Sequence, residues 1–384
     1  MELRLDLSKS YGIVLEGGGA KGAYQIGAWK ALKEANISIS AVSGVSVGAL
    51  NGAMIVMDKL EKAMQIWEHI TYSDVINVED TLVDAVFHGK MKYENLTTVV
   101  KDGWKVLISG GFDITPLKEL IKANIDEEQI RRSQIQFFLT TYSITNHKLL
   151  NININEIEEG QLCEMLLASA YLPVFKNEPL HGERFTDGGG WNLVPTDALI
   201  DAGYKDIIVI RIYGIGHQRK IEIPEDVTVY EIAPRYHLGG VLGFDAKQSK
   251  KNLKLGYYDM KRFLYGLEGI HYYFDCQMTE EQCYEEIVRK IREQNGELSL
   301  RTINERIIPQ IAEKVKNKKM STYRELYIKL LELSGKELKI TKYNIYTEQE
   351  FLTKIREVLE RENKTEQELE IVQSIREIVK KYTE

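Results

Sequence analysis

The serine with the strongest chemical context is Ser46, at the centre of Gly44-Val45-Ser46-Val47-Gly48. This G-x-S-x-G spacing is typical of a nucleophile elbow, in which the serine occupies a sharp turn between a strand and a helix. Side chains at Gly44 and Gly48 would collide across such a turn, so glycine is required at both positions. The turn presents the hydroxyl at a helix N-terminus, which makes Ser46 the candidate nucleophile. The alternative is a turn of small residues inside a packed strand and helix.

A glycine-rich loop precedes the elbow, at Gly17-Gly18-Gly19-Ala20-Lys21-Gly22. Consecutive glycines let several backbone N–H groups converge on one point, so the loop is predicted to bind an anion. A transient oxyanion fits, and so does a dinucleotide phosphate, because Gly17, Gly19 and Gly22 satisfy G-x-G-x-x-G. A dinucleotide site also needs an acidic residue about twenty positions later. Residues 37–44 include neither Asp nor Glu, so a nucleotide-binding protein is the weaker alternative.

A nucleophilic serine needs a base, and the candidate is Asp187, which opens Asp187-Gly188-Gly189-Gly190. Glycines at 188 and 189 would leave its carboxylate unobstructed on a loop. An Asp-Gly pair is also frequent in ordinary β-turns, so this motif alone does not establish a base. A Ser-His-Asp triad completed by His217 or His237 is a competing arrangement. Against it, α/β-hydrolases place the elbow after several strands, whereas here it closes the second predicted strand.

The elements that must position these motifs alternate along the chain. Apolar runs predict strands at 11–15, 39–42, 137–142 and 207–212, and helical patterns cover 24–32, 47–57 and 195–202. Strands separated by helices predict a three-layer α/β/α domain with a mainly parallel central sheet. Residues 71–111 have weak periodicity, and both an ordinary connection and a mobile cap over a site fit them.

Composition excludes several classes of protein. The 384 residues include 50 Lys+Arg and 57 Asp+Glu, a formal net charge of −7, which does not favour a protein that coats nucleic acid. Three scattered cysteines predict neither a disulfide framework nor a zinc site, and favour a reducing compartment. The N-terminus lacks the apolar stretch of a secretion signal, and the uncharged residues 36–57 are interrupted by serines and glycines. We therefore expect a cytoplasmic protein.

From about Thr279 the sequence changes to charged, amphipathic helices. Capping boxes are predicted at Thr279, Thr347 and Thr365, each with Gln or Glu three residues later. The last helix has an apolar stripe that must pack on something. We therefore divide the chain into an α/β domain, residues 1–275, and a helical extension of unknown role, residues 276–384. Packing on the α/β domain, a regulatory contact and a homo-oligomer all fit this extension.

Taken in order, the three motifs resemble the patatin-like phospholipase family, in its bacterial type. That family combines a G-G-G-x-K/R-G loop, a G-x-S-x-G elbow and a D-G-G/A motif. Ala168-Ser169-Ala170-Tyr171-Leu172-Pro173 is similar to its A-S-x-x-x-P block, and Gly256-Tyr257-Tyr258-Asp259 is similar to its late G-Y-x-D segment. The resemblance covers about residues 11–267. It departs at Glu16, where plant members often have Asp, and at Lys21, where many have Arg.

The resemblance implies a serine esterase: a lipid acyl hydrolase of phospholipase A or lysophospholipase type. Ser46 would be the nucleophile and Asp187 the base of a Ser-Asp dyad that forms an acyl-serine, without metal or cofactor. The implied oxyanion hole comprises Gly17, Gly18, Gly19, Lys21 and Gly22. A carboxylate is a weak base, with an ordinary pKa of about 3.9 against about 6.5 for imidazole, so direct contact with Ser46 is expected to compensate. An acyltransferase that uses the same acyl-serine is the open alternative, and a binding protein with a decayed site is a more distant one.

The resemblance implies a phospholipid or other acyl-lipid substrate as the partner. The net charge predicts no nucleic acid, and the C-terminal helices, which the resemblance does not cover, leave a homo-oligomer open. Membrane contact is expected to be peripheral and transient, because no anchor or strongly basic amphipathic helix occurs. Five apolar residues fit either an acyl tunnel or a protein core, and core packing is favoured for most of them: Leu50, Met54, Leu172, Val174 and Phe175.

Overall fold

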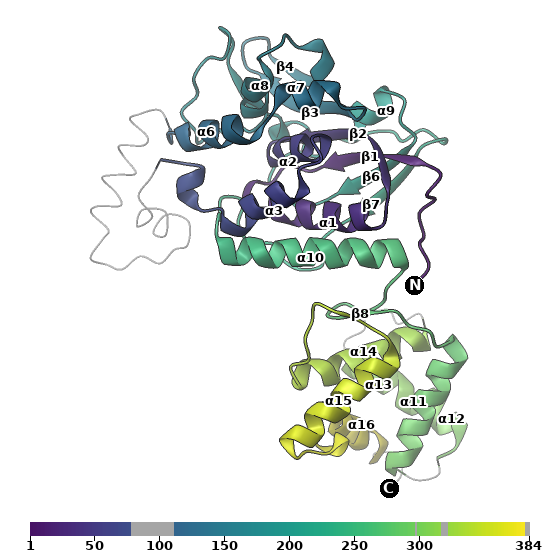
Figure 1. Ribbon diagram of the computed structural model, residues 1–384. Helices are drawn as coiled ribbons and strands as arrows, with labels where there is room; N and C mark the ends of the chain where they lie inside the picture. Colours follow the sequence, from purple (N-terminus) through teal and green to yellow (C-terminus); the bar gives the residue numbers. More distant parts are fainter. Residues whose placement is uncertain (78–110, 296–297, 316–321, 381–384) are drawn as a thin grey trace, which may run out of the picture. The chain divides into compact units, whose positions relative to one another are not determined.

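The computed structural model describes residues 1–77, 111–295, 298–315 and 322–380. Most of the predicted cap segment, 71–111, therefore lies outside the described residues. The chain forms two compact units: an α/β unit, residues 5–261, and a helical unit, residues 1–4 and 262–384 (Figure 1). The sequence-based boundary after residue 275 falls within the helical unit, and as a division of function it stays a prediction.

A seven-stranded sheet forms the centre of the α/β unit. Its strands are β1 Ser10–Leu15, β2 Ser38–Val45, β3 Gln136–Ser143, β4 Lys148–Asn153, β5 Phe185–Asp187, β6 Asp206–Ile210 and β7 Thr228–Ile232. The order is β4-β3-β2-β1-β6-β7, with β5 paired to β3. Neighbours from β3 through β2, β1 and β6 to β7 are parallel, whereas β4 and β5 run antiparallel to β3. The predicted mainly parallel sheet is confirmed, with an antiparallel part that the sequence pattern did not indicate.

Helices pack on both faces of this sheet. They are α1 Ala23–Glu34, α2 Val47–Val56, α3 Leu60–His69, α6 Thr115–Asn124, α7 Glu127–Arg132, α8 Leu162–Ser169, α9 Thr196–Asp201 and α10 Ala246–Tyr265. The apolar helix α2 packs against β1, β2 and β3. On the other face, Ala198 and Leu199 of α9 share an apolar core with Val14 of β1. The four strands and three helices predicted from apolar periodicity are all present.

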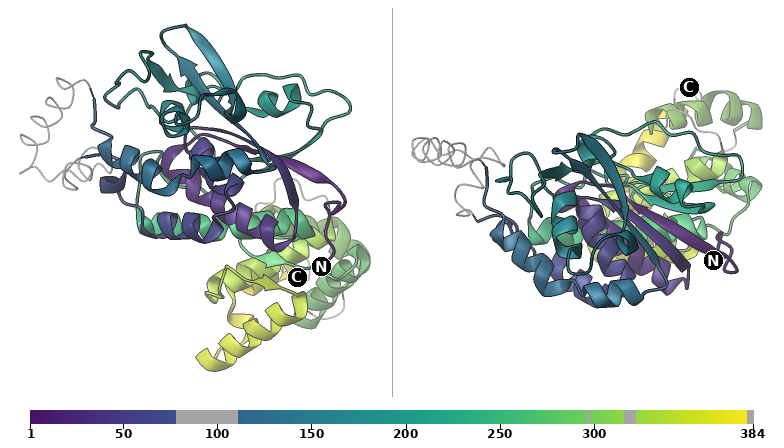
Figure 2. Two further views of the ribbon diagram at one scale, coloured as in Figure 1. Left: turned by 45° about the horizontal axis from the view of Figure 1, so that its top comes forward. Right: turned by 90° about the horizontal axis from the view of Figure 1, so that it is seen from above.

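Helix α10 lies along α1 in both Figures 1 and 2. The two backbones touch at glycines: a Cβ on Gly27 would lie 1.9 Å from the Leu253 carbonyl oxygen, and one on Gly256 would lie 1.9 Å from that of Tyr24. The Tyr24 hydroxyl also donates to the Asp259 carboxylate at 3.0 Å. The segment Gly256 to Asp259, which resembled a family motif, therefore fastens α10 to α1.

The helical unit has its own apolar core, rich in isoleucine and leucine. Its elements are β8 Tyr273–Phe274, α11 Glu280–Asn295, α12 Leu300–Thr302, α13 Ile308–Lys314, α14 Tyr323–Glu337, β9 Ile345–Tyr346, α15 Glu348–Glu362 and α16 Glu370–Lys380. The three predicted capping boxes are present: those at Thr279 and Thr347 open α11 and α15, and that at Thr365 opens a short 3-10 turn before α16. Helix formation in this unit thus follows local signals.

Candidate active site

The register of β3 brings the candidate nucleophile and the candidate base together. Val45, the last residue of β2, pairs with Thr140, and Asp187 at the end of β5 pairs with Thr141. Because these positions on β3 are adjacent, β2 and β5 end beside each other. Ser46 directly follows Val45, so the sheet places its hydroxyl next to the Asp187 carboxyl. A hydrogen bond joins the two side chains.

Ser46 has the backbone of a strained turn. Its φ is 56° and ψ is −129°, a region that residues other than glycine rarely occupy, and α2 begins at the next residue. A Cβ on Gly44 would lie 2.4 Å from the Gly48 carbonyl carbon, and one on Gly48 would lie 2.2 Å from the Leu15 carbonyl oxygen. Both glycines of the predicted elbow are therefore required by close backbone contact.

A second serine, Ser169, holds the elbow in place through hydrogen bonds. The hydroxyl of Ser169, the last residue of α8, donates to the Thr140 carbonyl at 2.7 Å and accepts the Ser46 N–H at 2.9 Å. It is fully buried. Ser169 thus ties the elbow to β3. Sequence reasoning assigned it no role, although its A-S-x-x-x-P context was the signal that could have found it.

Asp187 is a buried carboxylate with few partners. It accepts the Gly189 N–H at 2.7 Å and contacts the Ser46 hydroxyl. Burial, which disfavours the charged form, raises its pKa to about 6, although the hydrogen bonds from Ser46 and Gly189 act in the opposite direction. This value is close to that of free imidazole, about 6.5. The carboxylate is therefore a stronger base than the sequence alone suggested, and its burial is the cause.

The glycine-rich loop lies beside Ser46, between β1 and α1, with a 3-10 turn at Gly19–Gly22. Several of its N–H groups are engaged: those of Gly17 and Ala20 donate to Leu193 and Val241, and that of Lys21 donates back to the Gly18 carbonyl. Within the part of the chain that the structure describes, the N–H groups of Gly18 and Gly19 have no acceptor. Because both residues border the same cavity as Ser46, these two donors are free to stabilise an anion there.

Lys21 and Gly22, also predicted in the anion site, have other contacts. The Lys21 ammonium donates to the Tyr213 carbonyl, and its burial lowers its pKa, with Glu16 opposing that shift. A Cβ on Gly22 would lie 2.6 Å from Val47 and 2.7 Å from Trp67. Both residues hold the loop against its neighbours. The composition of the oxyanion hole stays a prediction, and the geometry favours Gly18 and Gly19 as its donors.

Glu16 anchors a loop behind the glycine-rich segment. It is fully buried and accepts the backbone N–H groups of Ile212, Tyr213 and Gly214 at 2.5, 2.9 and 3.3 Å. The Arg211 guanidinium also donates to it, at 3.1 Å. A Cβ on Gly214 would lie 1.9 Å from the Gly17 carbonyl oxygen, so this loop packs directly on the anion site. Sequence reasoning noted Glu16 only as a departure from the family pattern.

The histidines proposed for a triad are not bonded to the dyad. Among the described residues, the hydrogen-bond partners of the Asp187 side chain are Ser46 and Gly189. The backbone N–H of His217 donates to Gly189, and Nδ1 of His237 accepts the N–H of Gly239. Neither imidazole fills the place between serine and carboxylate that a triad requires. The geometry favours the dyad.

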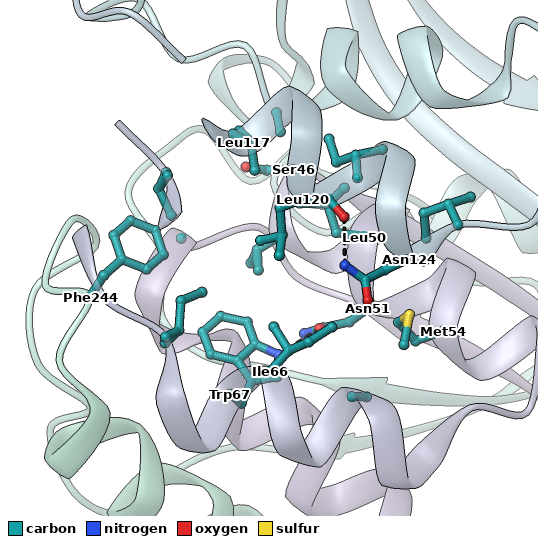
Figure 3. Close-up of a pocket in the computed structure, with 18 of the residues that line it drawn as sticks. Ser46, Leu50, Asn51, Met54, Ile66, Trp67, Leu117, Leu120, Asn124 and Phe244 are labelled. Carbon is teal, nitrogen blue, oxygen red and sulfur yellow. Dashed lines mark hydrogen bonds between the residues drawn. The ribbon is translucent and has the colours of Figure 1, made fainter. Parts of the chain in front are cut away.

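Two cavities meet at Ser46, sharing Gly19, Ser46 and Leu172 in their walls. One, of about 100 Å³, extends between α2, α3 and α6, and Figure 3 shows Leu50, Ile66, Trp67 and Leu120 around it. Its two asparagines already have hydrogen-bond partners: Asn51 bonds to Gly22, Gln25 and Trp67, and the Asn124 amide group donates to the Leu120 carbonyl. The other cavity, of about 670 Å³, contains Asp187 and the glycine-rich loop. Ser46 thus lies between an apolar recess and a larger, more polar space.

The five apolar residues expected to line either an acyl tunnel or the protein core all border these two cavities. Leu50, Met54, Leu172 and Phe175 border the apolar cavity, and Val174 borders the larger one. The preference for core packing was therefore incomplete: Met54 and Phe175 are buried, Leu50 and Leu172 are half-buried and Val174 is exposed, yet all five border a cavity. Among the described residues, no group of three or more His, Cys, Asp or Glu could hold a metal ion. No helix in the same residues is long and apolar enough to cross a membrane.

Comparison with known proteins relates this site to one family. Residues 13–200 match the model of a family described as patatin-like phospholipase. Patatin-like phospholipase domain-containing protein 7 of Rattus norvegicus is 24% identical over 207 residues, which are 54% of this chain and 14% of that protein. Neuropathy target esterase sws of Drosophila melanogaster is 28% identical over 206 residues, 52% of this chain and 13% of that protein. Lysophospholipase nte1 of Aspergillus terreus is 52% identical over 50 residues, 13% of this chain and 3% of that protein.

The chain thus spans less than a fifth of the length of these relatives. Among solved structures, that of VipD from Legionella pneumophila is 15% identical, with a TM-score of 0.43, over 93% of this chain and 81% of that one. The curated relatives named here come from animals and a fungus, so the bacterial type expected from the motifs stays a prediction.

Proposed function

We propose a function from one premise: residues 13–200 of this chain belong to the patatin-like phospholipase family, whose members are serine hydrolases. We propose that the chain hydrolyses the carboxylic esters of phospholipids or lysophospholipids through Ser46 and Asp187. The observation that supports this most is the direct hydrogen bond from the Ser46 hydroxyl to a buried carboxylate whose pKa is raised to about 6. Such a group is ionised at neutral pH and close enough to accept the serine proton.

The reaction proceeds in two halves. The Ser46 oxygen attacks the ester carbonyl carbon while its proton passes to Asp187, and the resulting oxyanion accepts hydrogen bonds from the Gly18 and Gly19 N–H groups. Collapse of this intermediate breaks the bond to the alcohol, which leaves with the proton from Asp187. Water then loses a proton to Asp187 and attacks the acyl-serine. Release of the fatty acid returns the proton to Ser46.

The two cavities suggest how the substrate lies. The recess between α2, α3 and α6 is lined by apolar side chains and by polar groups that already have partners, so it suits an aliphatic acyl chain. The larger cavity contains Asp187, which must protonate the leaving alcohol, so the head-group side of the ester belongs there. Ser46 and Leu172 border both spaces, which supports a pose with the ester carbonyl at their junction.

The test is intact-mass analysis after treatment with a soluble fluorophosphonate, which reports an activated serine without requiring the natural lipid. We expect one adduct on the wild type and none on Ser46→Ala. Asp187→Asn should label about a thousandfold more slowly, because the general base is lost. Ser38→Ala is the matched control, since Ser38 lies exposed at the start of the same strand. An adduct that persists in Ser46→Ala, or a labelling rate indifferent to Asp187→Asn, would contradict the proposal.

A further inference from the structure

Three apolar side chains are exposed around the mouth of the larger cavity. Val174 is 44% exposed, Trp191 41% and Ile215 83%. All three border the cavity that contains Ser46 and Asp187. A single exposed apolar residue is ordinary, but several at one opening form a patch of the kind that marks an interaction site. We call these three residues the apolar rim.

The rim is held in place by the structures that build the site. The Trp191 ring, directly after the Asp187-to-Gly190 turn, stacks on Tyr142 with centroids 3.7 Å apart. Ile215 lies between two glycines pressed against the site: a Cβ on Gly214 would lie 1.9 Å from the Gly17 carbonyl oxygen, and one on Gly216 would lie 2.1 Å from that of Gly189. With its backbone fixed on both sides, Ile215 projects into solvent.

The charge of the rim indicates what kind of partner fits. Of the residues that the structure describes in the walls of this cavity, Asp187 alone is charged, and it is buried. The whole chain has a net charge of −7. The exposed Lys176 and Arg219, which lie near the rim in the chain, are each paired with a carboxylate, Glu178 and Asp197. The three rim side chains are themselves uncharged, so they offer no attraction to an anionic partner. A tryptophan beside aliphatic side chains instead suits the interfacial layer of a bilayer, where an indole has both apolar and polar surroundings.

We propose that the apolar rim is the surface by which this chain docks on a bilayer of neutral, zwitterionic phospholipid. Val174, Trp191 and Ile215 enter the interfacial layer, and the mouth of the cavity then opens directly onto lipid. An ester can pass from the bilayer to Ser46 without exposing its acyl chain to water. This inference rests on the proposed function, because it takes the substrate to be a membrane lipid.

The experiment measures binding of the full chain to phosphatidylcholine vesicles by sedimentation, in the Ser46→Ala background so that no lipid is consumed. Ile215→Ser should weaken binding about tenfold or more, because it replaces an aliphatic side chain that enters the bilayer by a hydroxyl. Val174→Ser should act in the same direction. The matched control is Ile223→Ser, because Ile223 is a 51% exposed isoleucine of the same unit that does not border the cavity.

Two further readouts test the mode of binding. Trp191 fluorescence should shift to shorter wavelength on adding vesicles, and the shift should disappear in Trp191→Phe. Binding should change little between 0.1 and about 1 M salt, because the three rim side chains are uncharged. Equal binding by Ile215→Ser and Ile223→Ser would overturn the inference, as would salt-sensitive binding or no binding at all. A rim-dependent dimer of this chain in place of vesicle binding would also overturn it.

Failure of this inference and failure of the proposed function give different results. Fluorophosphonate labelling in solution reports the Ser46 dyad without any lipid surface. Normal labelling together with vesicle binding that does not depend on the rim would support the catalytic dyad and contradict the rim as a docking surface. Vesicle binding that depends on the rim, without any labelling of Ser46, would support the docking surface and contradict the proposed hydrolase function. Because Ile215 is exposed, its serine variant should keep the wild-type melting temperature, which shows that any loss of binding is not loss of folding.

Discussion

Each unit of the molecule buries a carboxylate, and the two differ in what surrounds them. In the α/β unit, Asp187 accepts one backbone N–H, contacts the Ser46 hydroxyl and borders a cavity. In the helical unit, Glu332 of α14 is 1% exposed, and one of its oxygens accepts three successive backbone N–H groups, those of residues 270, 271 and 272. Glu332 does not border the apolar cavity of its own unit. One carboxylate faces open space beside a nucleophile, whereas the other is surrounded by donors.

The difference shows that burial of a charge does not by itself mark a reactive group. Glu16 makes the point within the α/β unit, since it also accepts three successive N–H groups and directly precedes the glycine-rich loop. Glu16 and Glu332 each hold a loop in place, and their oxygens are occupied by the hydrogen bonds from that loop. Asp187 keeps capacity for a proton because few donors reach it.

The largest effect is expected from removing the structural carboxylate of the helical unit. Glu332→Ala leaves three backbone N–H groups without their acceptor, and unpaired buried donors are costly. We expect the free energy of unfolding of the helical unit to fall by about 3 to 5 kcal/mol, measured by denaturant titration. Ser46 labelling should keep its wild-type rate under native conditions. Glu360→Ala, at an exposed glutamate of α15, is the control. A comparable loss of stability in that variant would show that the effect does not come from the buried hydrogen bonds of Glu332.

The next effect is the pH dependence of the reaction. Because the pKa of Asp187 is raised to about 6, its basic form disappears below that pH. The kcat/KM for a soluble ester should fall about tenfold for each pH unit below about 6 and be level above it. The profile should be the same in His217→Asn, since no imidazole takes part. A rate that stays level down to pH 4, or a profile altered by His217→Asn, would show that another group is the base.

The same titration should act on stability with the opposite sign. The folded pKa of Asp187 lies above the ordinary value of 3.8, so the folded state holds a proton that the unfolded state releases between about pH 4 and 6. Stability therefore falls as pH rises through that window, and the penalty is complete above about 6. Asp187→Asn should be more stable than the wild type at pH 8, by about 1 to 3 kcal/mol, and equal to it near pH 4.

The smallest effect is expected from Glu16, a structural carboxylate near the site. Glu16→Gln replaces an acceptor oxygen by a donor that faces N–H groups, so the loop 212–214 should shift and displace Gly17 and Gly18. We expect kcat to fall about tenfold, equivalent to about 1.4 kcal/mol, with KM and the pH profile unchanged. Glu231→Gln is the matched control, because Glu231 binds the same Arg211 from an exposed position. A wild-type kcat in Glu16→Gln would show that this carboxylate does not position the loop.

The local features of this protein follow from its residue order. Strands and helices of the α/β unit could be predicted because apolar periodicity reflects which face of each element is buried. The capping boxes of α11 and α15 could be predicted because the bonds involved span three residues. The elbow at Ser46 could be predicted because Gly44 faces Gly48 within the turn, although the requirement for glycine at Gly48 comes from the Leu15 carbonyl of β1. From the sequence, the oxyanion donors could be assigned only to the glycine-rich loop as a whole. Which of its N–H groups are already bonded depends on the carbonyls of Leu193 and Val241, which lie far along the chain.

The properties that make the site reactive come from contacts between distant segments. Residues on β2 and β5 meet because both pair with β3, and no pattern within either segment reveals that register. The raised pKa of Asp187 requires burial by the whole fold, and Ser169 and Glu16 gain their roles from partners on other elements. The exposure of Ile215 is of the same kind, because an isoleucine in a sequence looks like a core residue until the backbone around it is placed. Solvation and close packing depend on three-dimensional neighbours, and these are the quantities that sequence periodicity does not contain.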